Sequence, residues 1–377
     1  MRVTDVEAIP METAIDTVTR QGGSSAQTIT VNPVMARVET DAGLTGVGET
    51  FVFDPEGSEA RMVAEGIEAM ASRVEGEDPR DVVARWHEMY TDAKRSTGYR
   101  SMSAIDEALW DLKGKDAGKP VYQLLGGEVG EIEAYATFPH FKEADQLVAD
   151  SEWLHEKGFP LMKIVATGDL EHDRHRVRTV AEGSPEGFGL AIDANTSYGF
   201  SDALKIAETG AEHDLEWFEE PISHLDVQGQ ARLNDRTTVS IAAYQTHRPH
   251  YPAVEHLRAD ALEIYQPTLD LVGGVTAADN VASMVEGFGK RFVPHTFGPG
   301  VNYAASLHVC AATPACDLIE FAVFDDTIDD PGRFITSPYL ANQDDIYVED
   351  DGTIRPPDGP GLGVEVDEAA LEEYRID

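Results

Sequence analysis

The alternation of hydrophobic and polar residues changes about a third of the way along the chain. In the first part, three segments alternate as antiparallel strands do, and three later segments repeat apolar residues at helical spacing. The expected strands span residues 3–9, 28–39 and 46–52, with Asp41-Ala-Gly43 as a hairpin turn, and the expected helices span 58–72, 79–92 and 101–117. Residues 19–26 are polar and rich in glycine, which predicts a mobile loop. Together these elements predict an α+β domain over residues 1–130.

From about residue 132 the pattern becomes a repeat of short apolar segments and amphipathic helices. The expected strands span 132–137, 161–165, 189–193, 215–219, 239–243, 261–266, 291–294 and 317–321, and helices such as 145–157, 173–182 and 276–288 separate most of them. Eight strands over roughly 190 residues favour a parallel β/α barrel, because an open doubly wound sheet needs a glycine-rich phosphate turn that this sequence lacks. We expect the barrel domain over residues 131–325, and a C-terminal segment, 326–377, that packs back on the first domain.

The charge of the chain limits its partners. It has 69 acidic and 29 basic residues and a formal net charge of −40. Nucleic acid and anionic membranes are excluded as partners, because both need clusters of Lys and Arg. There is no signal peptide and no apolar run long enough to span a membrane, so we expect a cytoplasmic protein. Its surface would repel itself at low salt, which favours a salt-adapted cytoplasm over the alternative, an acidic protein from a mesophile.

Four of the apolar segments end in side chains that can bind a metal or move a proton. Asp193, Glu219 and Gln245 follow three consecutive strands and are each separated by 26 residues, about one strand-loop-helix unit. They should therefore project from the C-terminal ends of neighbouring barrel strands. Oxygen ligands arranged in this way suit a hard cation such as Mg²⁺. His295 follows a fourth segment, whereas Cys310 and Cys316 lie among small residues and are expected to be buried and inert.

The chain resembles the mandelate racemase/muconate lactonizing branch of the enolase superfamily over nearly its whole length. The resemblance rests on segments 41–49, 103–115, 118–127, Asp193-Ala-Asn195, Trp217-Phe-Glu-Glu-Pro221, Gly273-Gly-Val-Thr276 and Gly361-Leu-Gly-Val364. It implies an α+β capping domain over a modified TIM barrel, (β/α)7β. It also implies removal of the proton α to the carboxylate of a small molecule, one Mg²⁺ per subunit that stabilises the enediolate, and a homo-oligomer.

The resemblance assigns metal ligands residue by residue. Asp193 and Glu219 match the first two ligands of the family, and Asn195 and Glu220 match groups that flank them. Gln245 stands at the third ligand position, where the family has Glu. Its carbonyl oxygen can still coordinate, but the triad then carries about two negative charges instead of three, so Mg²⁺ should bind more weakly. The alternative is a Gln245 that only lines the cavity.

The catalytic positions of the family are also altered. Lys163 is present, but the second lysine of the pair is replaced by Val165, so we assign Lys163 to binding the substrate carboxylate. His295 matches the base on the other side, and the position of its Asp partner holds Thr268. Asp270 lies on the same strand face as Thr268 by alternation and could take over that role. Glu320 matches the acid that donates to the substrate carboxylate in the family. Arg20 and Phe51 match positions on substrate-binding loops.

These departures decide the predicted reaction. Racemisation needs proton-transfer groups on both faces of the α-carbon, whereas His295 alone is sufficient to remove the α-proton and then assist departure of a β-hydroxyl group. We therefore predict a sugar-acid dehydratase that forms a 2-keto-3-deoxy acid. Two alternatives stay open at this point: a racemase or epimerase of a carboxylate substrate, and a catalytically silent relative that binds a ligand.

Overall fold

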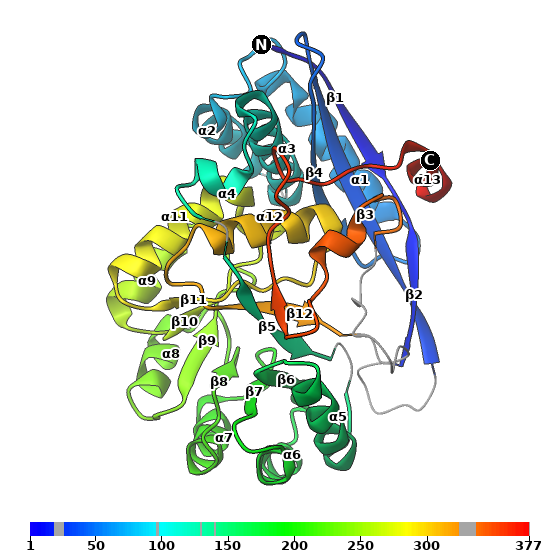
Figure 1. Cartoon of the computed structure of the whole chain (residues 1–377). Coiled ribbons are helices and arrows are strands. Elements are labelled where there is room, and N and C mark those ends of the chain that lie inside the picture. The colour runs from blue at the N-terminus through cyan, green and yellow to red at the C-terminus, as the bar shows by residue number, and fades with distance from the viewer. Residues whose placement is uncertain (19–25, 96–97, 129, 139–140, 324–336, 377) are drawn as a thin grey trace.

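The computed structural model describes residues 1–18, 26–95, 98–128, 130–138, 141–323 and 337–376. The chain begins with an antiparallel sheet that consists of β1 (Val3–Pro10), β2 (Thr13–Val18), β3 (Ala26–Thr40) and β4 (Thr45–Val52). Strand β3 lies between β1 and β4 and continues to pair with β2 at its other end (Figure 1). The hairpin predicted at residues 41–43 joins β3 to β4, with Gly43 at φ 76°. The sequence analysis missed β2, a short strand that pairs only with β3, and most of the predicted loop at 19–26 lies outside the described residues.

Helices cover one face of this sheet, much as the periodicity predicted. Helices α1 (Ser58–Met70) and α3 (Tyr99–Ala117) pack on the strands, whereas α2 (Val82–Ala93) and the short α4 (Val121–Leu124) pack on α3, and a 3₁₀ turn spans Ala71–Arg73. Helix α3 packs closely on β4, where a Cβ atom added at Gly48 would collide with the backbone of Ala104. Glycine therefore allows the close approach that buries α3 almost completely.

Eight parallel strands form the second part of the molecule. They are β5 (Ile132–Thr137), β6 (Leu161–Val165), β7 (Gly189–Asp193), β8 (Trp217–Glu219), β9 (Ser240–Ala243), β10 (Ile264–Tyr265), β11 (Arg291–Phe292) and β12 (Leu318–Ala322). Consecutive strands from β5 to β11 pair with each other, and β12 returns to pair with β5, so the sheet curls round as a modified TIM barrel does (Figure 1). The fold class predicted from the sequence is thus confirmed.

Helices surround the strands on the outside. They are α5 (Ala144–Glu156), α6 (Leu170–Gly183), α7 (Phe200–Glu212), α8 (Val227–Asn234), α9 (Pro252–Ala259), α10 (Leu269–Val272), α11 (Gly274–Gly287) and α12 (Gly300–Ala311). Cys310 is buried in α12, Cys316 is partly buried after it, and both thiols are free. None of the helices within the described ranges is long and apolar enough to cross a membrane.

The C-terminal residues contact both parts of the molecule. Strand β13 (Thr353–Ile354) pairs with β5 of the barrel, and α13 (Glu368–Tyr374) lies beside β1 (Figure 1). The backbone N–H of Glu12 donates to the carbonyl of Tyr374 at 2.8 Å, and that of Leu362 donates to the buried Asp111 of α3 at 2.8 Å. The segment thus joins the cap to the barrel, while the boundaries at 130 and 325 stay predictions.

Candidate active site

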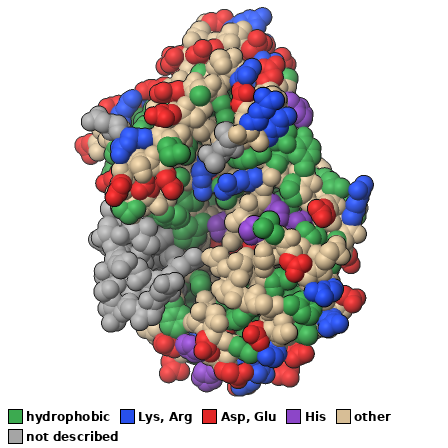
Figure 2. Space-filling view, turned by 180° about the vertical axis from the view of Figure 1, so that it is seen from behind, with side chains coloured by type: hydrophobic (Ala, Val, Ile, Leu, Met, Phe, Trp, Pro, Cys, Tyr) green, Lys and Arg blue, Asp and Glu red, His purple; other side chains and the backbone are tan. Residues whose placement is uncertain are grey.

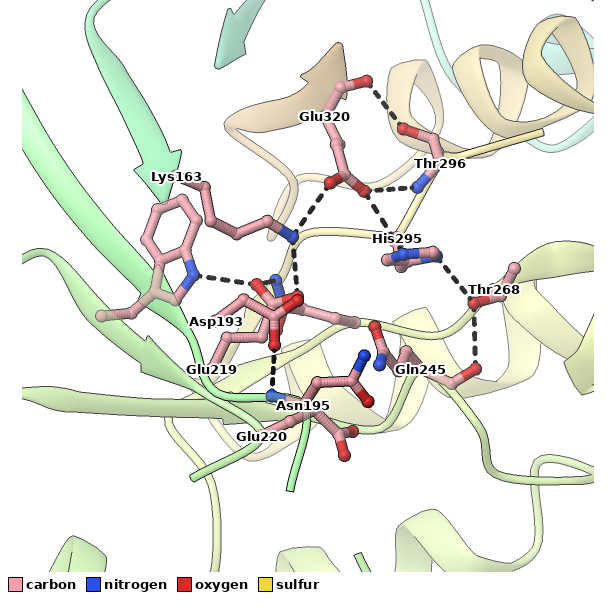
Figure 3. A network of polar contacts seen from close by, with 12 residues as sticks. Lys163, Asp193, Asn195, Glu219, Glu220, Gln245, Thr268, His295, Thr296 and Glu320 are labelled. Carbon is pink, nitrogen blue, oxygen red and sulfur yellow. Dashed lines mark hydrogen bonds and ion pairs between the residues drawn. The ribbon is translucent and has the colours of Figure 1, made fainter. Parts of the chain in front are cut away.

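Strand alternation builds a polar layer directly above an apolar one inside the barrel. One buried residue from each strand or its continuation forms a separate apolar cluster: Tyr135, Leu161, Ala191, Trp217, Ala242, Ile264, Val293 and Leu318. Side chains two positions further along point to the same face of a strand. On seven of the strands those positions hold Thr137, Lys163, Asp193, Glu219, Gln266, His295 and Glu320. After β9 the backbone turns at Tyr244, whose ring packs in the main core, and Gln245 lies at the site instead (Figure 3). The C-terminal ends of the strands therefore surround a polar site on an apolar floor.

Asp193, Glu219 and Gln245 converge at the ends of β7, β8 and β9, as the 26-residue spacing predicted (Figure 3). Glu219 is fully buried and accepts hydrogen bonds from Trp217 Nε1 (3.1 Å) and Gln266 Nε2 (2.8 Å). Gln245 is 9 % exposed, and its Oε1 atom is buried without a hydrogen-bond partner among the described residues. An unsatisfied buried carbonyl oxygen is costly unless it binds something, so this atom fits a ligand position.

The donor set and its charge fit a hard divalent cation. Asp193, Glu219 and the nearby Glu320 are carboxylates, and Lys163 is the one ammonium among them (Figure 3). Their formal charges leave two negative charges in a buried site, which is the charge that one Mg²⁺ would neutralise. In the part of the chain that the structure describes, no three His, Cys, Asp or Glu side chains are grouped as metal ligands. A three-ligand site here therefore requires the amide oxygen of Gln245.

Unusual backbone conformations occur at all three of these strand ends. Asn195, Glu220 and Tyr244 have positive φ angles of 44°, 43° and 105°. Such angles cost free energy in residues other than glycine and are typical of functional sites. Asn195 contacts Asp193 through its backbone N–H (2.8 Å to Oδ1), while its side chain is exposed. The flanking role that the resemblance assigned to Asn195 is thus carried, in this structure, by its backbone.

Glu220 ties neighbouring strand ends together. Its Oε1 accepts the backbone N–H of Tyr244 at 3.2 Å, and its own carbonyl accepts the N–H of Thr196 at 2.7 Å. Burial, and then the negative charge of Asp193, raise the pKa of Glu220 to about 8. Glu220 therefore adds little negative charge to the site at neutral pH and holds the loops in place.

The hydrogen bonds of Thr268 determine which nitrogen of His295 carries a proton. The hydroxyl of Thr268 donates to the carbonyl oxygen of Gln245 at 2.9 Å and also lies 3.1 Å from His295 Nδ1 (Figure 3). A hydroxyl has one hydrogen, so the second contact must be donated by Nδ1–H of the imidazole. Nε2 of a neutral His295 then has a free lone pair, 3.9 Å from Glu320 Oε2. Burial lowers the pKa of His295, although Glu320 opposes that shift, so the ring is neutral at pH 7.

Lys163 and Glu320 form a charged pair beside these groups. Lys163 is 1 % exposed, and its Nζ lies 2.7 Å from Glu219 Oε1 and 2.9 Å from Glu320 Oε1. Burial by itself would lower the pKa of Lys163, but the two carboxylates hold it well above its usual range. Burial likewise opposes ionisation of Glu320, yet Lys163 brings the pKa of Glu320 down to about 2. Glu320 is thus a hydrogen-bond acceptor here, and its predicted donor role stays a prediction.

Asp270 does not take the place of the missing Asp partner of His295. The prediction assumed that residues 268 and 270 share a strand, but β10 ends at Tyr265 and α10 begins at Leu269, so strand alternation no longer applies. Asp270 instead faces the cap, where Oδ2 accepts from Thr50 Oγ1 (3.0 Å) and forms an ion pair with Arg100. Thr268 alone provides the contact to His295 Nδ1 among the described residues.

The sequence placed Arg20 and Phe51 on substrate-binding loops at the entrance of the site. Arg20 lies outside the described residues, and Phe51 is buried, 5 % exposed, with its ring 5.4 Å from that of Phe53. Phe53 is 47 % exposed, and Phe297 lies 6.2 Å from both Phe53 and His295. Figure 2 shows hydrophobic and histidine side chains at the edge of a hollow on this face. Phe53 was missed, although its spacing of two from Phe51 along the end of β4 was a usable signal.

Comparisons with known proteins show the family of the chain. The chain matches the family "Enolase C-terminal domain-like" over residues 146–370 and "Mandelate racemase / muconate lactonizing enzyme, N-terminal domain" over residues 1–126. It is 32% identical to a D-galactarolactone cycloisomerase from Agrobacterium fabrum (91% of each chain) and 32% identical to a D-galactonate dehydratase from Ralstonia pickettii (89% of each). A Bradyrhizobium enolase crystallised with magnesium and mandelic acid superimposes with a TM-score of 0.83 at 25% identity, covering 100% of this chain and 99% of that one. The chain belongs to the mandelate racemase/muconate lactonizing branch of the enolase superfamily, as its sequence predicted.

Proposed function

We propose that this enzyme dehydrates a sugar acid to a 2-keto-3-deoxy acid. The observation that carries the proposal is the hydrogen-bond network that leaves His295 Nε2 as an unprotonated base on one side of the site. Asp193, Glu219 and Gln245 would hold Mg²⁺, the ion present with the Bradyrhizobium relative. When bound, Mg²⁺ would supply positive charge at the substrate carboxylate, where negative charge grows as the α-proton leaves.

The protein side chains then have separate tasks. Lys163 is held protonated and binds an oxygen of the substrate carboxylate through its ammonium group. His295 Nε2 takes the α-proton, and the C–H electron pair forms the double bond between the α- and β-carbons as the bond from the β-carbon to its hydroxyl oxygen breaks, which gives an enol. The resulting imidazolium gives its proton to the β-hydroxyl group, which leaves as water. The enol then takes up a proton at the β-carbon and becomes the keto acid.

The two sides of the site favour elimination over racemisation. Val165 follows Lys163 on β6 and points to the same strand face, yet it has no group that can carry a proton. The position opposite His295 that would serve a two-base mechanism is therefore apolar. The relative named as a dehydratase supports the same choice. The relative named as a cycloisomerase has the same sequence identity to this chain.

The reaction is tested with a panel of aldonic, aldaric and uronic acids, assayed for 2-keto acid formation with Mg²⁺. We expect at least one sugar acid to yield a keto acid, with activity that is lost on chelation and restored by Mg²⁺. Formation of an epimer in place of a keto acid would support a racemase or epimerase. No turnover across the panel, despite binding of a sugar acid, would support the catalytically silent relative.

We also propose that the enzyme works as a homo-oligomer in the cytoplasm of a salt-adapted cell. The salt adaptation is supported by the net charge of −40, which screening by salt would make tolerable. A melting temperature that rises steeply with KCl concentration is expected, and a flat response would contradict the salt adaptation. Light scattering at high salt measures the oligomeric state.

A further inference from the structure

Two arginines lie next to each other between the cap and the barrel. Arg100 is in the first turn of α3, and Arg248 lies three residues after Gln245 in the loop that follows β9. Asp270 is the carboxylate shared by this pair: it forms an ion pair with Arg100 and lies within electrostatic range of Arg248. Arg248 itself makes no hydrogen bond or ion pair with any residue that the structure describes.

The charge at this place is the opposite of that of the whole protein. Acidic residues outnumber basic ones by 69 to 29, so an arginine without a carboxylate of its own is unexpected. Burial, and then the neighbouring Arg100, lower the pKa of Arg248, yet a guanidinium stays charged at neutral pH. Two positive charges and one carboxylate leave one positive charge in excess. In addition, Asp270 Oδ1 is buried without a hydrogen-bond partner among the described residues, so it is available to a donor such as a sugar hydroxyl.

Aromatic contacts hold the loop that carries Arg248 against the cap. The loop of Arg248 packs on α2 of the cap, where His250 lies 5.3 Å from Trp86 and Tyr251 lies 5.5 Å from Tyr90. These contacts fix the loop in the gap between the two parts of the molecule.

A row of aromatic rings connects the pair to His295. It begins at Phe51, whose ring lies 5.5 Å from the Arg100 guanidinium, and it continues through Phe53 and Phe297 to the imidazole. A substrate with its reacting carboxylate at Lys163 would thus extend along this wall toward the two arginines.

We propose that Arg100 and Arg248 form a subsite for a second carboxylate, so that the substrate is a dicarboxylic sugar acid. One excess positive charge matches a monoanionic carboxylate, whereas a phosphate group carries close to two negative charges at neutral pH. Arginine presents paired N–H donors that fit a carboxylate. This inference deepens the proposed function and rests on it for the reaction, but binding of the second carboxylate can be measured without turnover.

The test compares two matched pairs of acids, galactarate with galactonate and glucarate with gluconate. Within each pair the hydroxyl configuration is the same, and the far end is either a carboxylate or a hydroxymethyl group. We expect wild type to prefer the diacid. Arg248→Gln should lose about 10- to 100-fold in kcat/KM for the diacid, mainly through KM, because a charged hydrogen bond is removed, while the monoacid changes less than about twofold. Arg258→Gln, an exposed arginine on α9, is the matched control and should change neither.

Arg100 is left intact in this test, because its ion pair with Asp270 supports the loop of Thr268. Equal losses on diacid and monoacid, or a wild type that prefers the monoacid, would overturn the subsite. Preference for 6-phosphogluconate over both would overturn the assignment to a carboxylate. If none of the acids is turned over, calorimetry measures binding of the same pairs to wild type and Arg248→Gln. Diacid binding that is weaker in Arg248→Gln would then support the subsite, although the proposed reaction would have failed.

Discussion

The two sides of the active site are built for different tasks. On the β6 side, Lys163 lies between two carboxylates that keep it protonated, and its neighbour on the same face is the apolar Val165. On the side of β10 and β11, His295 has no charged partner at Nδ1, and the hydroxyl of Thr268 holds it as a neutral ring. The difference shows that the neighbours of a basic side chain determine whether it stays protonated or can accept a proton. In the proposed reaction, one side binds charge and the other moves a proton.

Removal of the His295 imidazole should have the largest effect on the activity of the enzyme. His295→Asn is expected to reduce kcat by about 10² to 10⁴, because a positioned base is lost while the groups that bind the substrate remain. Steady-state kinetics measures the loss, and His175→Asn on the exposed face of α6 is the matched control. Retention of near-normal activity would remove His295 from the mechanism and return Lys163 to consideration as the base.

A carboxylate in place of Thr268 should change the pH dependence. Thr268→Asp would place a negative charge against Nδ1–H and stabilise the protonated ring, so the pKa of His295 should rise from its lowered value. The base must be unprotonated, and the acidic limb of kcat/KM should therefore move to higher pH by about one to three units. Thr268→Ser keeps the hydroxyl and should leave the profile in place. An unchanged profile in Thr268→Asp would show that residue 268 does not set the basicity of His295.

The proposed metal ligands allow a similar test, in which the amide of Gln245 is exchanged for a carboxylate. Gln245→Glu should bind Mg²⁺ at least about tenfold more tightly, about 1.4 kcal/mol, because a third carboxylate joins Asp193 and Glu219. Isothermal titration of Mg²⁺ measures the change, and Asp193→Asn should weaken binding as the opposite control. Equal affinity in wild type and Gln245→Glu would mean that Gln245 lines the cavity without binding the metal.

The smallest effect is expected from a second amine opposite His295. Val165→Lys would put a basic group on the face that now has none, and slow exchange of the α-proton from that face should appear. Val165→Met fills the same space without a base and should show no such exchange. If a folded Val165→Lys gains no exchange on the second face, residue 165 does not face the α-carbon.

Strand patterns predicted most of the polar layer, because alternation determines which side chains face the barrel interior. Lys163, Asp193 and Glu219 lie on strands whose C-terminal ends were predicted to the residue, and His295 follows a strand that is shorter than expected. The prediction went wrong beyond the strand ends. Asp270 was given a strand position that the start of α10 abolishes, and its real partners, Thr50 and Arg100, come from the other domain.

The entrance was the least predictable part of the site for the same reason. Phe53 lies beyond the end of β4, and Arg100 and Arg248 are separated by 148 positions in the chain. Periodicity describes side chains on one element, whereas these residues meet only when the cap packs on the barrel. Sequence reasoning therefore located the candidate residues at the strand ends and missed the two arginines, which meet only in the folded protein.

The proposed mechanism requires that a single base acts on one face of the substrate. Incubation of the enzyme with its sugar acid in D₂O, followed by NMR of the recovered substrate, measures exchange at the α-carbon directly. We predict deuterium at the α-position of one epimer only, with no second epimer formed, and no exchange in His295→Asn. Deuterium in both epimers, or exchange that persists without His295, would contradict the account.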